Sequence, residues 1–232
     1  MRFVGTIARL AGVAAAGYGG YAAFTWLRYG RQKKVQPTTV LDRFMPEAEV
    51  IDRHCVGVNA PTDITYETCC AFDVAGSRVA QMLFDTRAYA LGSKPSHPML
   101  PPHLVEQMKA LGWVVLEETP GHEIVFGIAA KPWVANGGFR ALSATEFATF
   151  HEAGWVKIIF NFTVESAARC CSLLATETRA IATDGKSRKR FRTYWSLVAP
   201  GVKLIRRTAL HAIKTKAEST VQSALRSAAT AA

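Results

Sequence analysis

The chain has 232 residues, 49% of them apolar and 20% charged, which is enough for one domain with a buried core and a short additional segment. Its net charge of +10 is unevenly spread: residues 1–34 and 186–216 hold six and ten Lys or Arg and no acid, whereas residues 35–185 hold 11 basic and 17 acidic residues. This pattern excludes a uniformly basic fold. It indicates an acidic body with two basic ends, which suit a membrane surface or another anionic partner.

An uncharged run of 18 residues, "LAGVAAAGYGGYAAFTWL" at 10–27, dominates the first segment. That length is near the lower limit for a bilayer-spanning helix, and the cations that begin at Arg28 favour a membrane anchor with the body in the cytoplasm. The alternatives are a cleaved targeting segment with a soluble body in another compartment, and a peripheral or disordered segment. We therefore predict an anchor or targeting segment over 1–34 and a linker over 35–47.

The next elements alternate between short strands and short helices. Residues 48–61 predict one strand, and residues 61–73 predict an amphipathic helix. Helical segments are also predicted over 76–91 and 102–112, on either side of a proline-rich loop. Residues 113–130 predict a hairpin that turns at 119–121, and Ser143 followed by Glu146 predicts a capping box that opens a helix over 143–154.

Two consecutive strands, at 155–166 and 171–184, alternate strongly between their two faces. One face carries Phe160, Phe162, Thr176 and Thr178, and the other carries Trp155, Lys157, Asn161, Glu177 and Arg179. The alternation does not indicate which of the two faces a helix covers.

Residues 187–219 predict one long helix that is kinked at Pro200. Its apolar residues form a stripe that keeps its phase through the proline: Phe191, Trp195, Val198, Val202, Ile205, Ala209 and Ile213. Basic residues off the stripe, such as Lys203 and Arg206, are expected to snorkel, on a face that is solvated or turned toward anionic headgroups. The preceding strands argue against a nucleic-acid-reading helix. A disordered tail is predicted over 219–232.

The remaining polar residues predict no metal and no cofactor. The cysteines lack the spacing of a disulfide framework or a zinc site: Cys55, Cys69, Cys70, Cys170 and Cys171. The six histidines form no metal-binding motif. His54, on the first strand, is interpreted as a structural residue, with a cavity-facing position as the alternative.

The order of these elements resembles the helix-grip fold of the START-like superfamily, also called SRPBCC, which includes polyketide cyclases and lipid-transfer domains. The segments that show it are "VIDRHCVGVNAPTDITYE", "GWVKIIFNFTV", "LLATETRAIATD" and "RFRTYWSLVAPGVKLIRRTALHAIKTKAE". The last two look much like an uncharacterised bacterial subgroup. The resemblance implies an α+β fold over 48–218, with an antiparallel sheet wrapped around the long helix and an apolar cavity between them.

The resemblance implies binding of a hydrophobic small molecule or lipid in that cavity. Its helix wall would contain Phe191, Trp195, Val198 and Val202. Two sheet walls stay open: one contains Phe160, Phe162 and the threonines, and the other is a polar floor of Lys157, Asn161, Glu177 and Arg179. The second set would otherwise form ion pairs on a solvated face.

Two other functions stay open beside ligand binding. One is a cyclase- or dehydratase-like enzyme that uses Lys157, Glu177 or His54 as acid–base groups. The other is a non-catalytic protein that binds a protein partner or takes part in assembly at a membrane. We predict membrane contact through residues 10–27 and the basic flanks.

Overall fold

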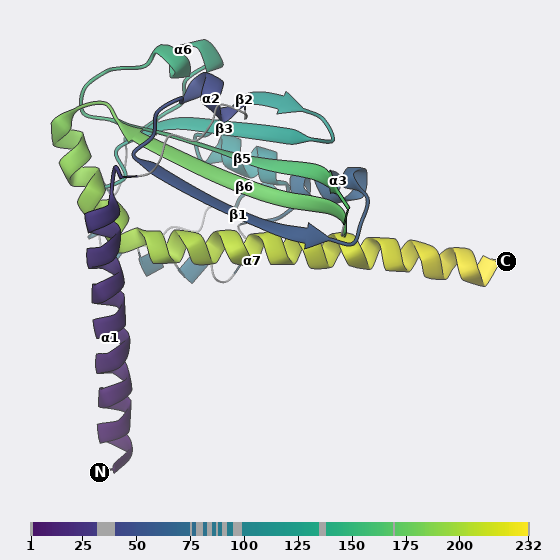
Figure 1. The fold of residues 1–232 in the computed structure, drawn as a ribbon, viewed down its shortest axis with the longest axis horizontal. Coiled ribbons are helices and arrows are strands. Elements are labelled where there is room, and N and C mark those ends of the chain that lie inside the picture. The colour runs from purple at the N-terminus through teal and green to yellow at the C-terminus, as the bar shows by residue number, and fades with distance from the viewer. Residues whose placement is uncertain are drawn as a thin grey trace.

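The computed structural model describes residues 2–31, 40–74, 76–77, 81–82, 85–86, 88–89, 92–94, 99–134, 138–168 and 170–231. These residues form an α+β fold, which confirms the predicted class. It combines an antiparallel sheet with a long C-terminal helix and an N-terminal helix that projects from the body (Figure 1).

The helices are α1 (Arg2–Arg28), α2 (Leu41–Phe44), α3 (Thr62–Cys70), α5 (Leu104–Ala110), α6 (Ala144–Thr149) and α7 (Gly185–Ala231). The strands are β1 (Val50–Val58), β2 (Val114–Thr119), β3 (Glu123–Ala130), β4 (Phe139–Arg140), β5 (Val156–Ala167) and β6 (Cys170–Ala182). The predicted strands, the hairpin and the capping box of Ser143 and Glu146 are confirmed. Most of the helix predicted over 76–91 lies outside the described residues, and α2 lies within the predicted linker.

The sheet has the strand order β1-β6-β5-β3-β2, and β4 pairs with β3. All of its ladders are antiparallel, and the central pair joins β5 to β6. Phe160 lies opposite Thr178 and Phe162 opposite Thr176 in that pair. The two phenylalanines of β5 and the two threonines of β6 therefore lie on the same face of the sheet.

The two faces of the sheet are both buried, under different helices. The inner face, covered by α3, α5 and α7, packs Phe160 and Phe162 with Leu210 and Ile213 of α7. The outer face, covered by α2 and α6, packs Ile159 and its neighbours in a second apolar cluster. Burial on both sides explains why β3 is buried at every position.

α7 is bent, and Figure 1 shows a short first arm that turns into a long second arm beneath β1. Pro200 lies inside the helix, where it lacks an amide donor and its ring crowds the preceding turn. The predicted kink is therefore confirmed. The helix extends to Ala231, through most of the segment for which a disordered tail is predicted. Ala-rich sequence favours helix, and an existing helix extends without a new nucleation step.

The residues of the predicted apolar stripe of α7 differ in burial. Phe191 and Ile213 are buried, whereas the stripe residues between them are half-buried: Trp195, Val198, Val202, Ile205 and Ala209. Leu210 and Ala217 of the second arm are also buried. Lys203 and Arg206, which were expected to snorkel, reach Asp52 and Thr176 on the inner face.

α1 docks on the bend of α7 through its C-terminal half. The Tyr18 hydroxyl donates a hydrogen bond to the Leu197 carbonyl. The guanidinium of Arg192 lies 3.4 Å from the Trp26 ring centroid, and its Nε donates to the Trp26 carbonyl at 2.7 Å. Residues 10–27 are thus helical. In the part of the chain that the structure describes, no helix combines the length and apolar character needed to cross a membrane.

Candidate functional site

A group of polar side chains lies on the inner face where β1 and β6 meet the second arm of α7. We call it the inner polar cluster, and it consists of Asp52, His54, Thr176, Thr178, Lys203 and Arg206. The β1–β6 register places Asp52 opposite Thr178 and His54 opposite Thr176. The second arm of α7 supplies the two cations, Lys203 and Arg206.

The acidic side of the cluster is well paired. His54 Nε2 lies 3.0 Å from Asp52 Oδ2, and both side chains are largely buried. Lys203 Nζ lies 3.7 Å from the other carboxylate oxygen of Asp52, Oδ1. When Nε2 carries the proton, His54 donates to the carboxylate, and its other ring nitrogen is then a base.

The Arg206 guanidinium is only partly satisfied. Its Nη1 donates to Thr176 Oγ1 at 2.9 Å, and its Cζ lies 5.4 Å from the Phe160 ring centroid. The residue as a whole is half-buried, but its Nε is enclosed and has no hydrogen-bond partner among the described residues. The Thr178 hydroxyl is also enclosed and has no hydrogen-bond partner among the described residues. Burial lowers the pKa of Arg206 to about 10, and the nearby Asp52 carboxylate opposes that shift.

The Arg206 Nε and the Thr178 hydroxyl are buried donors that an acceptor group could satisfy. At neutral pH the guanidinium is still charged, because its lowered pKa of about 10 lies well above 7. A buried cation with an unused N–H is unfavourable unless a polar or anionic group approaches it. Around it lie aromatic rings: Phe160 stacks on Phe126 at a centroid distance of 5.0 Å and meets Trp113 edge-on at 4.8 Å. The arrangement suits an apolar molecule that carries one acceptor group.

The predicted apolar site residues fall in two places. Phe160 and Phe162 lie on the inner face, which is the face that α7 covers. Phe191 is buried and Trp195 half-buried on the first arm of α7, where both pack against the end of the sheet. Val198, next to the bend, is half-buried. The first arm therefore contacts a different part of the inner face from the inner polar cluster.

The predicted polar site residues lie on the outer face, away from α7. Arg179 Nη1 donates to Asp42 Oδ1 at 2.6 Å and to the Met45 carbonyl at 3.0 Å, and its Nε donates to Glu177 Oε1 at 2.7 Å. Asn161 Oδ1 accepts from the Glu177 amide at 2.9 Å. These contacts are buried and fasten α2 to the sheet, so they form neither a solvated face nor a floor under α7.

Lys157, the fourth residue of that set, also lies under the outer helices. Its Nζ donates to the Ala148 carbonyl at 3.2 Å and lies 4.9 Å from the Phe147 ring centroid. Burial lowers the pKa of this lysine. The contacts tie the residues of α6 to β5, and they do not include Glu177.

Sequence reasoning missed Arg206, Asp52 and Thr178 as members of one cluster. Asp52 and His54 are two residues apart on β1, and this spacing places them on the same face of the strand. Arg206 gave no such signal, because its place off the apolar stripe predicted a snorkelling side chain.

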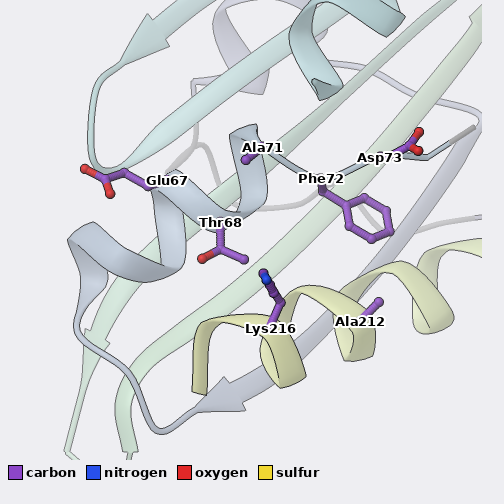
Figure 2. A pocket seen from close by; sticks show the side chains of 7 residues that line it. All are labelled: Glu67, Thr68, Ala71, Phe72, Asp73, Ala212 and Lys216. Atoms are coloured by element: carbon purple, nitrogen blue, oxygen red, sulfur yellow. The ribbon is translucent and has the colours of Figure 1, made fainter. Parts of the chain in front are cut away.

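A separate, open pocket of about 470 Å³ lies between α3 and α7, and Figure 2 shows its lining. The lining residues are Glu67, Thr68, Ala71, Phe72, Asp73, Ala212 and Lys216. Phe72 points toward α7 and Lys216 points toward α3, whereas Glu67 and Asp73 point away. Its charged side chains are exposed to solvent, so no buried group there requires a ligand. Among the described residues, no group of three or more His, Cys, Asp or Glu is placed to hold a metal ion.

Comparison with known proteins adds little to this geometry. No family model and no curated protein matches the chain. Protein CV1439 from Chromobacterium violaceum is a solved structure that is similar over 67% of this chain and 96% of its own, with 12% identity and a TM-score of 0.26. That likeness carries no argument about function. The sheet and long C-terminal helix are compatible with a helix-grip arrangement, but the comparisons name no family.

Proposed function

We propose that the protein is a membrane-associated, START-like domain that binds a hydrophobic small molecule or lipid between α7 and the inner face of the sheet. We further propose that the ligand carries an anionic, hydrogen-bond-accepting group that binds Arg206 and Thr178. One observation supports this most: the enclosed Arg206 Nε and the Thr178 hydroxyl have no partner among the described residues, and they lie beside the Phe160 ring.

The energetics favour such a ligand. Leaving a buried donor unpaired costs about 1–3 kcal/mol, and a hydrogen bond to a charged group contributes about 1.5–3 kcal/mol. A carboxylate that reaches Arg206 would form the hydrogen bond to a charged group and would also remove the cost of the unpaired donor. The apolar part of the same molecule would displace water from the aromatic side chains of the inner face.

The test begins with native mass spectrometry of the full chain, followed by extraction and identification of any bound hydrophobic species. Binding of oleate and of methyl oleate is then measured on wild-type protein, Arg206→Met and Arg207→Met. Arg207 is exposed and follows directly in the sequence, so it is a matched control. We expect wild type to prefer oleate, Arg206→Met to lose at least about tenfold in oleate affinity, and Arg207→Met to match wild type.

The proposal is rejected if no hydrophobic species co-purifies and neither probe binds saturably. Equal oleate affinity of Arg206→Met and wild type would reject the role of Arg206 while leaving hydrophobic binding in place. An empty protein that co-purifies with a stoichiometric protein partner would support the third function, a non-catalytic interaction protein.

A second candidate is a cyclase- or dehydratase-like enzyme, and the Asp52–His54 pair favours it. A carboxylate 3.0 Å from one ring nitrogen can orient the imidazole so that the other nitrogen acts as a general base. Lys157 and Glu177, the other acid–base candidates, lie on the outer face in structural contacts. If a substrate screen finds turnover, His54→Gln should reduce it by about 10²–10⁴-fold. Unchanged turnover in that variant would remove the candidate.

A further inference from the structure

We propose that the surface formed by α1 and the bend of α7 docks on an anionic lipid bilayer. We call it the elbow surface, and its large exposed side chains are Tyr18, Phe24, Trp26, Leu27, Leu197 and Leu204. The inference deepens the membrane association that is part of the proposed function, and it does not depend on the interior ligand.

The apolar part of the elbow surface comes from two distant segments of the chain. Phe24 and Leu27 of α1 are 54% and 53% exposed, and Leu197 and Leu204 of α7 are 52% and 47% exposed, on either side of Pro200. Figure 1 shows α1 leaving the body near the bend, with its N-terminal end far from the sheet. Large apolar side chains exposed on two helices that contact each other favour contact with another apolar phase.

The charge of the elbow surface selects a negative partner. Arg9, Arg28 and Arg31 are exposed on and after α1, and Lys189 and Arg190 are exposed on the first arm of α7. Neither residues 2–31 nor residues 186–216 contain an acid, so no neighbour in these segments neutralises them. Cations near the surface of an anionic leaflet each contribute to attraction toward it.

The mixture of side chains favours a bilayer over the other anionic partners. The Arg28 guanidinium lies 5.2 Å from the Phe24 ring centroid, and that of Arg192 lies 3.4 Å from the Trp26 ring centroid. Aromatic rings beside cations match the headgroup region, where the rings meet the acyl boundary and the cations meet phosphates. The Trp26 ring, covered by Arg192, has less face available for stacking on a nucleic-acid base.

A second copy of the chain is a weaker fit to the same surface. Two elbow surfaces brought face to face would place arginine against arginine with no acid from either segment to separate them. Contacts with the body also fix the surface before docking: the Tyr18 hydroxyl of α1 bonds to the Leu197 carbonyl of α7, and the hydroxyl of Tyr29, just after α1, bonds to Glu49, just before β1. The bilayer would therefore meet a preformed surface.

The test measures flotation of the full chain with vesicles of phosphatidylcholine alone and of phosphatidylcholine mixed with phosphatidylglycerol. Two variants change the elbow surface: Leu27→Ser, and the double variant Arg28→Gln with Arg31→Gln. Their matched controls, Leu225→Ser and Arg226→Gln, change exposed residues at the far end of α7. Circular dichroism checks that all four chains fold.

We expect wild type to float with the anionic vesicles, and less so as salt is raised. Neutralising two cations should weaken binding by roughly 25-fold, since each surface cation near an anionic leaflet contributes roughly fivefold. Leu27→Ser should weaken it by about fivefold. Both controls should bind as wild type does. Equal binding of the elbow variants and wild type, or equal flotation with neutral and anionic vesicles, would overturn the proposal.

Two further outcomes separate this inference from the ligand proposal. Arg206→Met should float as wild type does, because the inner polar cluster is not part of the elbow surface; loss of flotation in that variant would contradict the separation of the two sites. If wild type fails to float but forms a dimer that Leu27→Ser abolishes, the elbow surface binds a second copy and the bilayer proposal is wrong.

Discussion

At the scale of single residues, Arg179 is the ion whose removal should matter most to the fold. It is 1% exposed and holds the carboxylates of Asp42 and Glu177 at 2.6 and 2.7 Å. Arg179→Met would leave two buried carboxylates without their cation. We expect the free energy of unfolding to fall by about 3–5 kcal/mol, because breaking a buried pair leaves an uncompensated charge. Urea unfolding followed by fluorescence measures the loss.

Two comparisons decide whether that loss reflects the buried carboxylates. Arg140→Met opens an exposed ion pair with Glu152 and should change stability far less. Adding Asp42→Asn and Glu177→Gln to Arg179→Met should recover much of the loss, because no unpaired charge then remains. If the triple variant is no more stable than Arg179→Met, the arginine contributes through packing alone.

Glu123 offers a pH-dependent test on the same face. It is 5% exposed and accepts a hydrogen bond from Asn161 Nδ2 at 2.6 Å, and burial raises its pKa more than that bond lowers it. The folded state therefore holds this proton more tightly than the unfolded state. The resulting stability is present below the usual carboxyl pKa and is lost as pH rises through the raised one.

Glu123→Gln keeps the acceptor for Asn161 but removes this titration. We expect the variant to gain stability relative to wild type as pH rises from the usual carboxyl range to neutrality, and the difference to be constant above it. Urea midpoints at a series of pH values measure the change. Glu165→Gln, at an exposed position of β5, is the control. Parallel stability curves for wild type and Glu123→Gln would contradict the assignment.

At the scale of elements, the β2–β3 hairpin depends on a close approach between its two strands. A Cβ atom on Gly127 of β3 would lie 2.9 Å from Cγ of Leu116, which is buried in the outer-face core. Gly127→Ala should therefore lower the free energy of unfolding by about 1–3 kcal/mol through overpacking. Leu116→Ala alone should lower it by about 2–5 kcal/mol through the cavity it leaves.

The double variant should be less unstable than the sum of the two single variants, because each relieves the defect of the other. Gly20→Ala is the matched control, since an added Cβ there meets nothing within 4 Å. It should not destabilise the protein. Additive losses in the double variant would show that Leu116 moves aside and that the close approach has no role.

How much the sequence predicts also differs between elements. Strict alternation identified β5 and β6, and the spacing of Ser143 and Glu146 identified the start of α6, because both signals are local. Pro200 located the bend of α7 but not the way in which the following arm packs on β1 and β6. That packing decides whether Arg206 faces solvent or Thr176. The surroundings of Lys157, Asn161, Glu177 and Arg179 were likewise not predictable, because they depend on where α2 and α6 cover the outer face.

At the scale of the whole molecule, the acidic body and the basic ends are joined by specific pairs. Arg188 of α7 pairs with Glu49, and Lys203 pairs with Asp52 on the neighbouring strand. Only part of the basic charge is used in this way, since Lys189 and Arg190 stay exposed. The sequence-level charge asymmetry therefore has two roles: some cations fasten α7 to the sheet, and the others form the charge of the elbow surface.

The attachment of α1 predicts how much of the N-terminal segment the body needs. Among the side chains of α1 that the structure describes, Tyr18 is the first with a hydrogen bond to α7, and residues 15–20 are exposed. Tyr29 packs edge-on to Phe191 at a centroid distance of 6.0 Å, and its hydroxyl donates to Glu49. Phe191 is 1% exposed, so losing Tyr29 would uncover it. The first part of α1 should thus be dispensable for stability and the last part should not.

A chain that lacks residues 1–17 should melt at the wild-type temperature. A chain that lacks residues 1–31 should melt roughly 4–8 °C lower, as expected if lost burial and a lost hydrogen bond together remove about 2 kcal/mol. Tyr29→Ala in the full chain should reproduce most of that shift. Differential scanning calorimetry of the four chains decides the matter. An equal shift in both truncated chains would show that the early turns of α1 contribute to the fold, and no shift in either would show that α1 is not docked on α7 in solution.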